Sequence, residues 1–121
     1  MQLQFLEEAF SVLKVSDLTA AMLDMPYVFA ARTADECSLV CRTQDKPDRF
    51  LSCEDGWRAF RVAGKLDFSL IGILAGITQA LAQARVGVFV VSTYDTDYVL
   101  LKEGQRVDAI NALEDAGYTV A

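Results

Sequence analysis

The sequence contains no histidine among its 121 residues. This absence excludes the Ser–His and Cys–His pairs that activate many nucleophiles, and it removes the side chain most often used for acid–base catalysis. An enzyme built on this chain would depend on Asp or Lys side chains with displaced pKa values, and Lys65 and Lys102 lie in no recognisable motif. We therefore expect a protein that is not an enzyme and that needs no cofactor.

Cysteine is also scarce, with Cys37, Cys41 and Cys53 only. Cys37 and Cys41 lie four residues apart on a predicted strand, which places them on one face at about 13 Å and too far apart for a disulfide. A zinc site would need a fourth ligand, and there is no histidine to supply it. We therefore expect reduced cysteines that act as small core residues and no metal site.

Long apolar runs are missing as well. The longest, Leu70–Ile77, ends at Thr78 and is far shorter than the roughly 20 residues of a membrane-spanning helix. The first residues, Met1–Gln4, do not read as a signal peptide. Acidic residues outnumber basic ones by 17 to 11, and the basic residues are scattered along the chain. We expect a cytoplasmic protein whose partners are neither nucleic acid nor a membrane.

Apolar residues make up 53% of the chain, which is enough for a hydrophobic core. In the second half their spacing predicts an α+β unit of the ferredoxin-like order β-α-β-β-α-β. The expected elements are the strand Trp57–Val62, the helix Ser69–Arg85, the strands Val88–Thr93 and Tyr98–Lys102, a helix over Gln105–Ala116 and a strand over Tyr118–Val120.

The expected helix ends follow from local residue types. Ser69 is the type of residue that caps a helix N-terminus. Gly87 lies close to the position after the first helix where a left-handed backbone is needed, and Gly117 is expected to end the second helix.

The first half resembles a shorter copy of this unit. Val28-Phe29 aligns with Val88-Phe89, and the same offset of sixty residues places Thr33 on Thr93 and Asp35 on Asp95. Ala9–Val12 aligns with Ala59–Val62 at an offset of fifty. The sequence therefore predicts two copies of one unit, a degenerate one over residues 1–52 and a complete one over residues 53–121.

The first copy lacks a counterpart of the second helix, because Arg42–Arg49 contains Lys46-Pro47-Asp48 and is typical of a connector. A missing helix leaves sheet surface that another part of the chain or a second chain must cover. We therefore expect a homodimer.

The run Ser92–Tyr98 between the apolar strands is the most informative motif. It places two carboxylates and several hydroxyls at the mouth of a hairpin. Asp97, with Asp67 and Thr93 behind it, can accept hydrogen bonds from an ammonium group. For Asp95, formation of the turn itself is the stronger explanation.

The opposite charge of a zwitterion can bind at a helix N-terminus, where free main-chain amides and a partial positive charge favour a carboxylate. The segment Ser69–Ile73 is expected to form that terminus, and Gly72 would let a ligand approach the backbone. Close packing of Gly72, capping of the helix by Asp67, and a hydrophobic contact of Phe68 at the helix start remain alternatives.

The segments Asp67–Leu74 and Ser92–Leu100 together are similar to the ACT domain family. The resemblance covers residues 57–121 well and the first half loosely. It is strongest to small tandem ACT proteins related to the lysine- and arginine-sensing ACT domains of aspartokinases and to CASTOR-type arginine sensors. It implies a non-catalytic regulatory module that binds an amino acid at an interface between two ACT units.

The resemblance also implies ligand contacts from the loop before the first helix and from the hairpin mouth. Combined with the motifs above, the predicted ligand-binding residues are Asp67, Phe68, Ser69, Leu70, Ile71, Gly72, Ile73, Thr93 and Asp97.

One departure concerns Ile71, where the family commonly has a threonine before the glycine. A hydroxyl contact is lost there. The alternative prediction is therefore a structural module that keeps the fold and has lost its ligand. A module of either kind could pack against a second copy of itself or against another protein, which the sequence does not identify.

Overall fold

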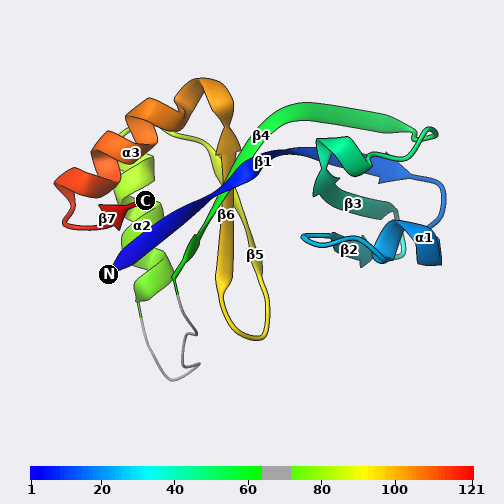
Figure 1. Ribbon diagram of the computed structural model, residues 1–121, viewed down its shortest axis with the longest axis horizontal. Coiled ribbons are helices and arrows are strands. Elements are labelled where there is room, and N and C mark those ends of the chain that lie inside the picture. Colours follow the sequence, from blue (N-terminus) through cyan, green and yellow to red (C-terminus); the bar gives the residue numbers. More distant parts are fainter. Residues whose placement is uncertain (64–71) are drawn as a thin grey trace. The chain divides into compact units, whose positions relative to one another are not determined.

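The structure, a computed structural model, describes residues 1–63 and 72–121 (Figure 1). Its strands are β1 (Gln2–Val15), β2 (Phe29–Arg32), β3 (Cys37–Arg42), β4 (Ser52–Val62), β5 (Val88–Ser92), β6 (Asp97–Lys102) and β7 (Thr119–Val120). Its helices are α1 (Ala20–Leu23), α2 (Ile73–Gln83) and α3 (Arg106–Asp115), and short 3-10 turns, η1 and η2, span Thr43–Asp45 and Glu103–Gln105.

The chain forms two compact units. Unit 1 contains Met1–Glu7 and Arg58–Ala121, and unit 2 contains Glu8–Trp57. The long strands β1 and β4 each contribute one end to unit 1 and the other end to unit 2. The domain boundary predicted between residues 52 and 53 separates two copies of a repeat, whereas the two units described here are defined by their compactness. The boundary between the copies stays a prediction.

Unit 1 has the predicted α+β character. β6 lies between β4 and β5, β4 is next to β1, and the two-residue strand β7 pairs in parallel with the start of β1. The helices α2 and α3 lie together on one side of these strands (Figure 1). Their buried faces and the strands enclose one hydrophobic cluster, whose largest members include Leu3, Phe60, Ile77, Leu81, Leu101 and Leu113.

Helix α2 begins four residues later than the sequence predicts. It starts at Ile73, and Gly72 before it has a φ of 84°. A left-handed residue cannot belong to a right-handed helix, and glycine adopts this conformation without a Cβ clash. The expected cap Ser69 lies outside the described residues. Among residues 1–63 and 72–121, no atom lies within 4 Å of a Cβ placed at Gly72, so packing against these residues does not explain this glycine.

The other end of α2 also differs from the prediction. The left-handed residue is Arg85, with φ 60°, and not Gly87. The amide of Val86 donates to the carbonyl of Leu81 at 2.9 Å, which closes the C-terminal turn. Gly117 forms the same turn after α3, with φ 100° and Tyr118 N–H donating to Leu113 at 3.0 Å, so its predicted role is confirmed.

Unit 2 is a small antiparallel assembly in which β3 lies between β1 and β2. Its buried cluster consists of Leu13, Val15, Cys37, Leu39 and Cys41. The cysteines are free thiols, and the expectation that they pack as small core residues is confirmed for the two on β3. Burial, with smaller contributions from the charges of Asp45 and Cys53, raises the pKa of the Cys41 thiol to about 11.

The two hairpins share one register at an offset of sixty residues. Phe29 pairs with Val40 in unit 2, and Phe89 pairs with Leu100 in unit 1. The strands β3 and β6 and the turns η1 and η2 begin and end at the same offset. In unit 2, however, the chain proceeds from η1 to β4 without a helix, where unit 1 has α3.

None of the helices in residues 1–63 and 72–121 is long and apolar enough to cross a membrane.

The left-handed arginine after α2 yields a stability prediction. Arg85 is exposed, and a non-glycine residue at this φ is strained by about 1 kcal/mol. Replacement of Arg85 by Gly is expected to raise the free energy of unfolding by about 0.5–1 kcal/mol, measured by urea denaturation. The matched change Gly117→Ala should lower it by about 1 kcal/mol. A loss of stability in Arg85→Gly would contradict the assigned backbone conformation.

Candidate functional site

The turn between β5 and β6 is built around Thr93. The Thr93 amide donates to the carbonyl of Thr96 at 2.8 Å, and the Thr93 hydroxyl donates to the same carbonyl at 3.0 Å. The Thr96 amide in turn donates to the Thr93 hydroxyl at 3.4 Å. Thr93, a predicted ligand contact, is half-buried. Both hydrogen bonds of its hydroxyl group are made within its own turn.

A buried hydroxyl anchors this turn to the rest of unit 1. Thr96 is only 8% exposed, and its Oγ1 donates to the carbonyl of Val62, the last residue of β4, at 3.2 Å. The contact joins residues 34 positions apart in the sequence. The hairpin mouth is thus fixed at the end of β4, from which the chain leaves toward α2.

Asp97 is the acceptor that the sequence predicts at this mouth. It forms the terminal β5–β6 pair with Ser92, whose hydroxyl donates to Asp97 Oδ1 at 2.5 Å. The residue is half-buried. A carboxylate has about four acceptor positions, so one hydrogen bond from Ser92 orients the group and leaves capacity for an ammonium ligand.

The start of α2 supplies hydrogen-bond donors. Gly72 provides no capping side chain, and the first turn of the helix, as described, contains no acidic residue. The first helical hydrogen bond runs from Gly76 N–H to Gly72 at 2.9 Å, so the amides of Ile73–Ala75 precede the helical ladder. The sequence predicts that the free amides at the helix start belong to Ser69–Ile73, whereas the described helix offers those of Ile73–Ala75. The start of α2 and the β5–β6 turn lie toward the same end of unit 1 (Figure 1).

Five of the predicted ligand contacts cannot be placed. Asp67, Phe68, Ser69, Leu70 and Ile71 lie outside the described residues. Of the remaining four, Gly72 and Ile73 open α2, while Thr93 and Asp97 form the hairpin mouth. Within residues 1–63 and 72–121, no group of three or more Cys, Asp and Glu side chains is arranged to hold a metal ion.

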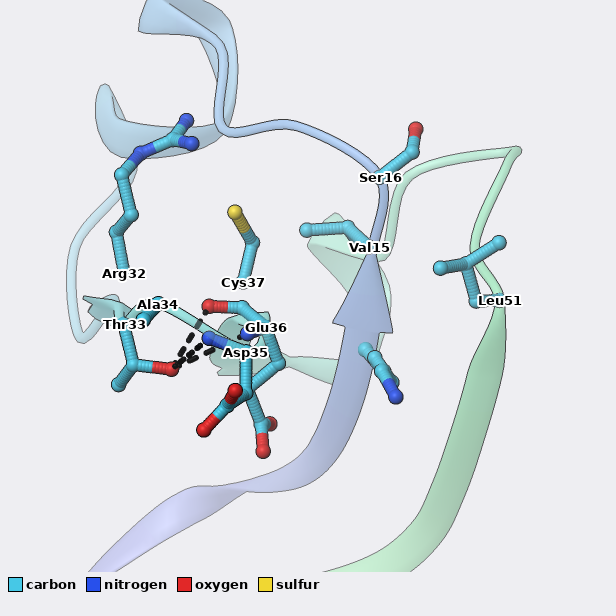
Figure 2. A pocket seen from close by; sticks show the side chains of 10 residues that line it. Val15, Ser16, Arg32, Thr33, Ala34, Asp35, Glu36, Cys37 and Leu51 are labelled. Carbon is cyan, nitrogen blue, oxygen red and sulfur yellow. Dashed lines mark hydrogen bonds between the residues drawn. The ribbon is translucent and has the colours of Figure 1, made fainter.

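The sequence reasoning missed a depression in unit 2, at the mouth of the other hairpin (Figure 2). It has a volume of about 280 Å³ and is lined by the end of β1, the β2–β3 turn and Leu51. Lys14, Asp35 and Glu36 give it charges of both signs. The offset of sixty residues, which places Thr33 on Thr93, was the signal that could have directed attention to this turn.

The chain is similar to one protein family and to several solved structures. The family model described as ACT domain matches residues 52–115. The structure of protein Atu0741 from Agobacterium tumefaciens is similar over 99% of this chain and 91% of that chain, with a TM-score of 0.88 and 27% identity. No curated protein matches the chain.

Two more distant structures share the fold. The regulatory subunit of aspartate kinase from Thermus thermophilus, in its ligand-free form, matches with a TM-score of 0.64 and 8% identity over 95% of this chain and 96% of that one. The protein VC0802 from Vibrio cholerae, described as a possible transport protein, matches with a TM-score of 0.75 and 14% identity over 92% of this chain and 85% of that one.

The anchoring hydroxyl of Thr96 generates a prediction. Thr96→Val keeps the shape and removes the hydrogen bond to Val62, so the free energy of unfolding is expected to fall by about 1–2 kcal/mol in urea denaturation. Thr78→Val is the matched control, because the Thr78 hydroxyl donates to Leu74, a helical carbonyl that also accepts a backbone bond. The control should change stability by less than about 0.5 kcal/mol. Equal losses in the two variants would refute the anchoring role.

Proposed function

The chain belongs to the ACT domain family, and from this premise we propose that it is a regulatory protein that binds a free amino acid at the β5–β6 mouth of unit 1. ACT domains and the regulatory-domain neighbours of this chain are regulatory modules rather than catalysts. The proposal adds a ligand class and a site to that general role.

The observation that carries the proposal is the carboxylate of Asp97. Ser92 holds it by a hydrogen bond of 2.5 Å, and Thr96 fixes the turn that carries it. An oriented, half-buried carboxylate can bind an ammonium group without first losing the freedom of its own side chain. Such a charged hydrogen bond contributes about 1.5–3 kcal/mol.

The α-carboxylate of the ligand would bind at the start of α2. The amides of Ile73–Ala75 have no capping side chain from Gly72 and carry the positive end of the helix dipole. Donors and acceptor then belong to different elements that lie toward the same end of unit 1 (Figure 1). This arrangement suits the two opposite charges of an amino acid.

We further propose that the chain carries two ACT-like copies and works as a homodimer. The shared register of the β2–β3 and β5–β6 hairpins supports the repeat. The passage from η1 to β4 without a helix supports a degenerate first copy. Ligand binding between ACT units would then alter how this chain packs on a second copy or on another protein, and so act in trans.

A second candidate function is a structural module that has lost its ligand. Two features favour it: Ile71 stands where the family commonly has a hydroxyl, and the Thr93 hydroxyl is used inside its own turn. Both reduce the number of hydroxyl groups offered to a ligand. We favour the sensing function, because the Asp97 carboxylate is oriented by Ser92 and keeps acceptor positions for a ligand.

Amino-acid binding is tested by a thermal-shift screen with each of the twenty free amino acids. A ligand of the native state stabilises by about 1.4 kcal/mol when its free concentration is ten times the Kd. We expect at least one amino acid to raise the melting temperature in proportion to the logarithm of its concentration. A flat response to all twenty would favour the structural module.

The role of Asp97 is tested with the amino acid that this screen identifies. Asp97→Asn keeps an acceptor for Ser92 and removes the negative charge, so affinity measured by calorimetry should fall roughly 10- to 150-fold. Asp95→Asn is the matched control, because Asp95 is an exposed residue of the same turn, and it should bind as the parent does. Unchanged affinity in Asp97→Asn would remove Asp97 from the site.

The assembly is tested by sedimentation velocity of the full chain at micromolar concentration. We expect a dimer, with the equilibrium shifted measurably by the amino acid found in the screen. A monomer at every concentration, with and without that amino acid, would contradict both the dimer and binding between chains.

A further inference from the structure

Strand β5 is an edge strand without the features that usually protect an edge from pairing with another chain. Among residues 1–63 and 72–121 it pairs only with β6, so one side of its backbone has no strand partner there. Natural edge strands are commonly protected by lysine, proline or a β-bulge. The sequence of β5, Val-Phe-Val-Val-Ser, contains no charge and no proline, and it pairs with β6 residue for residue. The outer side of β5 therefore suits a further strand.

The hydrogen bonds inside the hairpin show which groups point outward from this edge. The Thr93 amide donates to the carbonyl of its cross-strand partner Thr96. Hydrogen-bonded pairs alternate along an antiparallel ladder, so Val91 and Phe89 also face β6 with their amides and carbonyls. The amides and carbonyls that point away from β6 are those of Val88, Val90 and Ser92.

These outward groups match a second copy of the same strand. In an antiparallel pair with its two-fold axis at Val90, that residue faces Val90 of the second copy, and Val88 faces Ser92 of the second copy. Every outward amide and carbonyl of β5 then has a partner. An axis at Phe89 would leave Ser92 unpaired, and an axis at Val91 would leave Val88 unpaired. The backbone therefore favours the axis at Val90.

The side chains of β5 also fit this register. Val88 and Val90 pack against the hydrophobic cluster of unit 1, so Phe89 and Val91 belong to the opposite face of the strand, where they are half-buried. The axis at Val90 places Phe89 beside Val91 of the second copy, and the symmetry repeats this contact. Aromatic and β-branched side chains form favourable cross-strand pairs.

The charges at the two ends of β5 are complementary in the same register. Arg85 precedes the strand and Asp95 follows it, and both are exposed. Within residues 1–63 and 72–121, neither has an ion-pair partner within 4.0 Å. Antiparallel pairing brings Arg85 of each copy toward Asp95 of the other, whereas parallel pairing sets like charges side by side. In a chain with a net charge of −6, this complementarity favours the antiparallel arrangement.

From these observations we infer that the outer edge of β5 is the surface through which two copies of this chain pair, as a two-fold antiparallel extension of the sheet. The inference rests on the homodimer of the proposed function and names the surface that forms it. A two-fold pair occupies the β5 edges of both copies, so assembly through this edge ends at a dimer.

Charge reversal tests the register by sedimentation velocity of the full chain. Arg85→Asp and Asp95→Arg each place like charges together at both ends of the pair, so each should raise the dimer dissociation constant about fivefold. An equimolar mixture of the two variants restores opposite charges at both ends of a mixed pair, and it should dimerise as the parent does. If the mixture dimerises no better than either variant alone, the inference is wrong.

Cross-linking tests the position of the axis. In the register above, Val90 meets its own copy with Cα atoms about 5.5 Å apart, which is within reach of a disulfide. Val90→Cys, in a Cys53→Ser background, should therefore give a covalent dimer on a non-reducing gel after mild oxidation. Val88→Cys in the same background is the matched control and should not, because Val88 lies roughly 14 Å from its own copy. Equal cross-linking of the two variants would overturn the register.

A lysine on β5 tests the surface itself. Val91→Lys places a charge beside Phe89 of the second copy and should make the chain monomeric. Val107→Lys adds the same charge to a side chain that is 69% exposed on α3, and it should leave the dimer intact.

The outcomes separate this inference from the proposed function. A dimer that withstands Val91→Lys and gives no cross-link at Val90→Cys would overturn the β5 surface and leave the homodimer standing on another surface. A parent chain that is monomeric at every concentration would contradict both, and it would leave the edge to a strand from another protein. Amino-acid binding is read separately, in the thermal-shift screen.

Discussion

The hydrogen bond from the buried Thr96 hydroxyl to the carbonyl of Val62 is the constraint on which the geometry of unit 1 depends. It ties a hairpin turn to the strand that precedes α2, so two segments distant in sequence meet at one end of the unit. Without it, Asp97 would be carried by a turn held only by its own local bonds. A ligand site made of single contacts from several elements needs such a fixed frame, because each loose element would add an ordering cost on binding.

The two hairpins show how one backbone design supports different surface chemistry. Each turn is organised by a threonine, Thr33 or Thr93, with the same amide-to-carbonyl hydrogen bond. The fourth residue of the turn differs: Thr96 is turned inward and buried, whereas Glu36 is exposed and carries a charge. The first choice strengthens the attachment of the turn, and the second leaves a charge at the surface of unit 2.

Most of the fold could be predicted from the sequence, because it follows from apolar periodicity. The apolar run of β5, the return strand β6 and the glycine that ends α3 all give local signals. The ends of α2 could not be predicted in the same way. Gly72 is one of several glycines that could begin or interrupt a helix, and Arg85 adopts a conformation that its side chain does not favour. The place of Asp97 at the hairpin mouth was predictable from its position beside a turn, whereas the inward rotation of Thr96 depends on tertiary packing.

The burial of Cys41 has a practical consequence for the chemistry of the chain. With a thiol pKa of about 11, only about one molecule in ten thousand carries the reactive thiolate at neutral pH. Alkylating agents and peroxide attack that thiolate, so the native protein should resist both at this position. Cys41 is 1% exposed on the central strand of unit 2, so we expect its modification to follow local opening of that unit and its modification rate to report that opening.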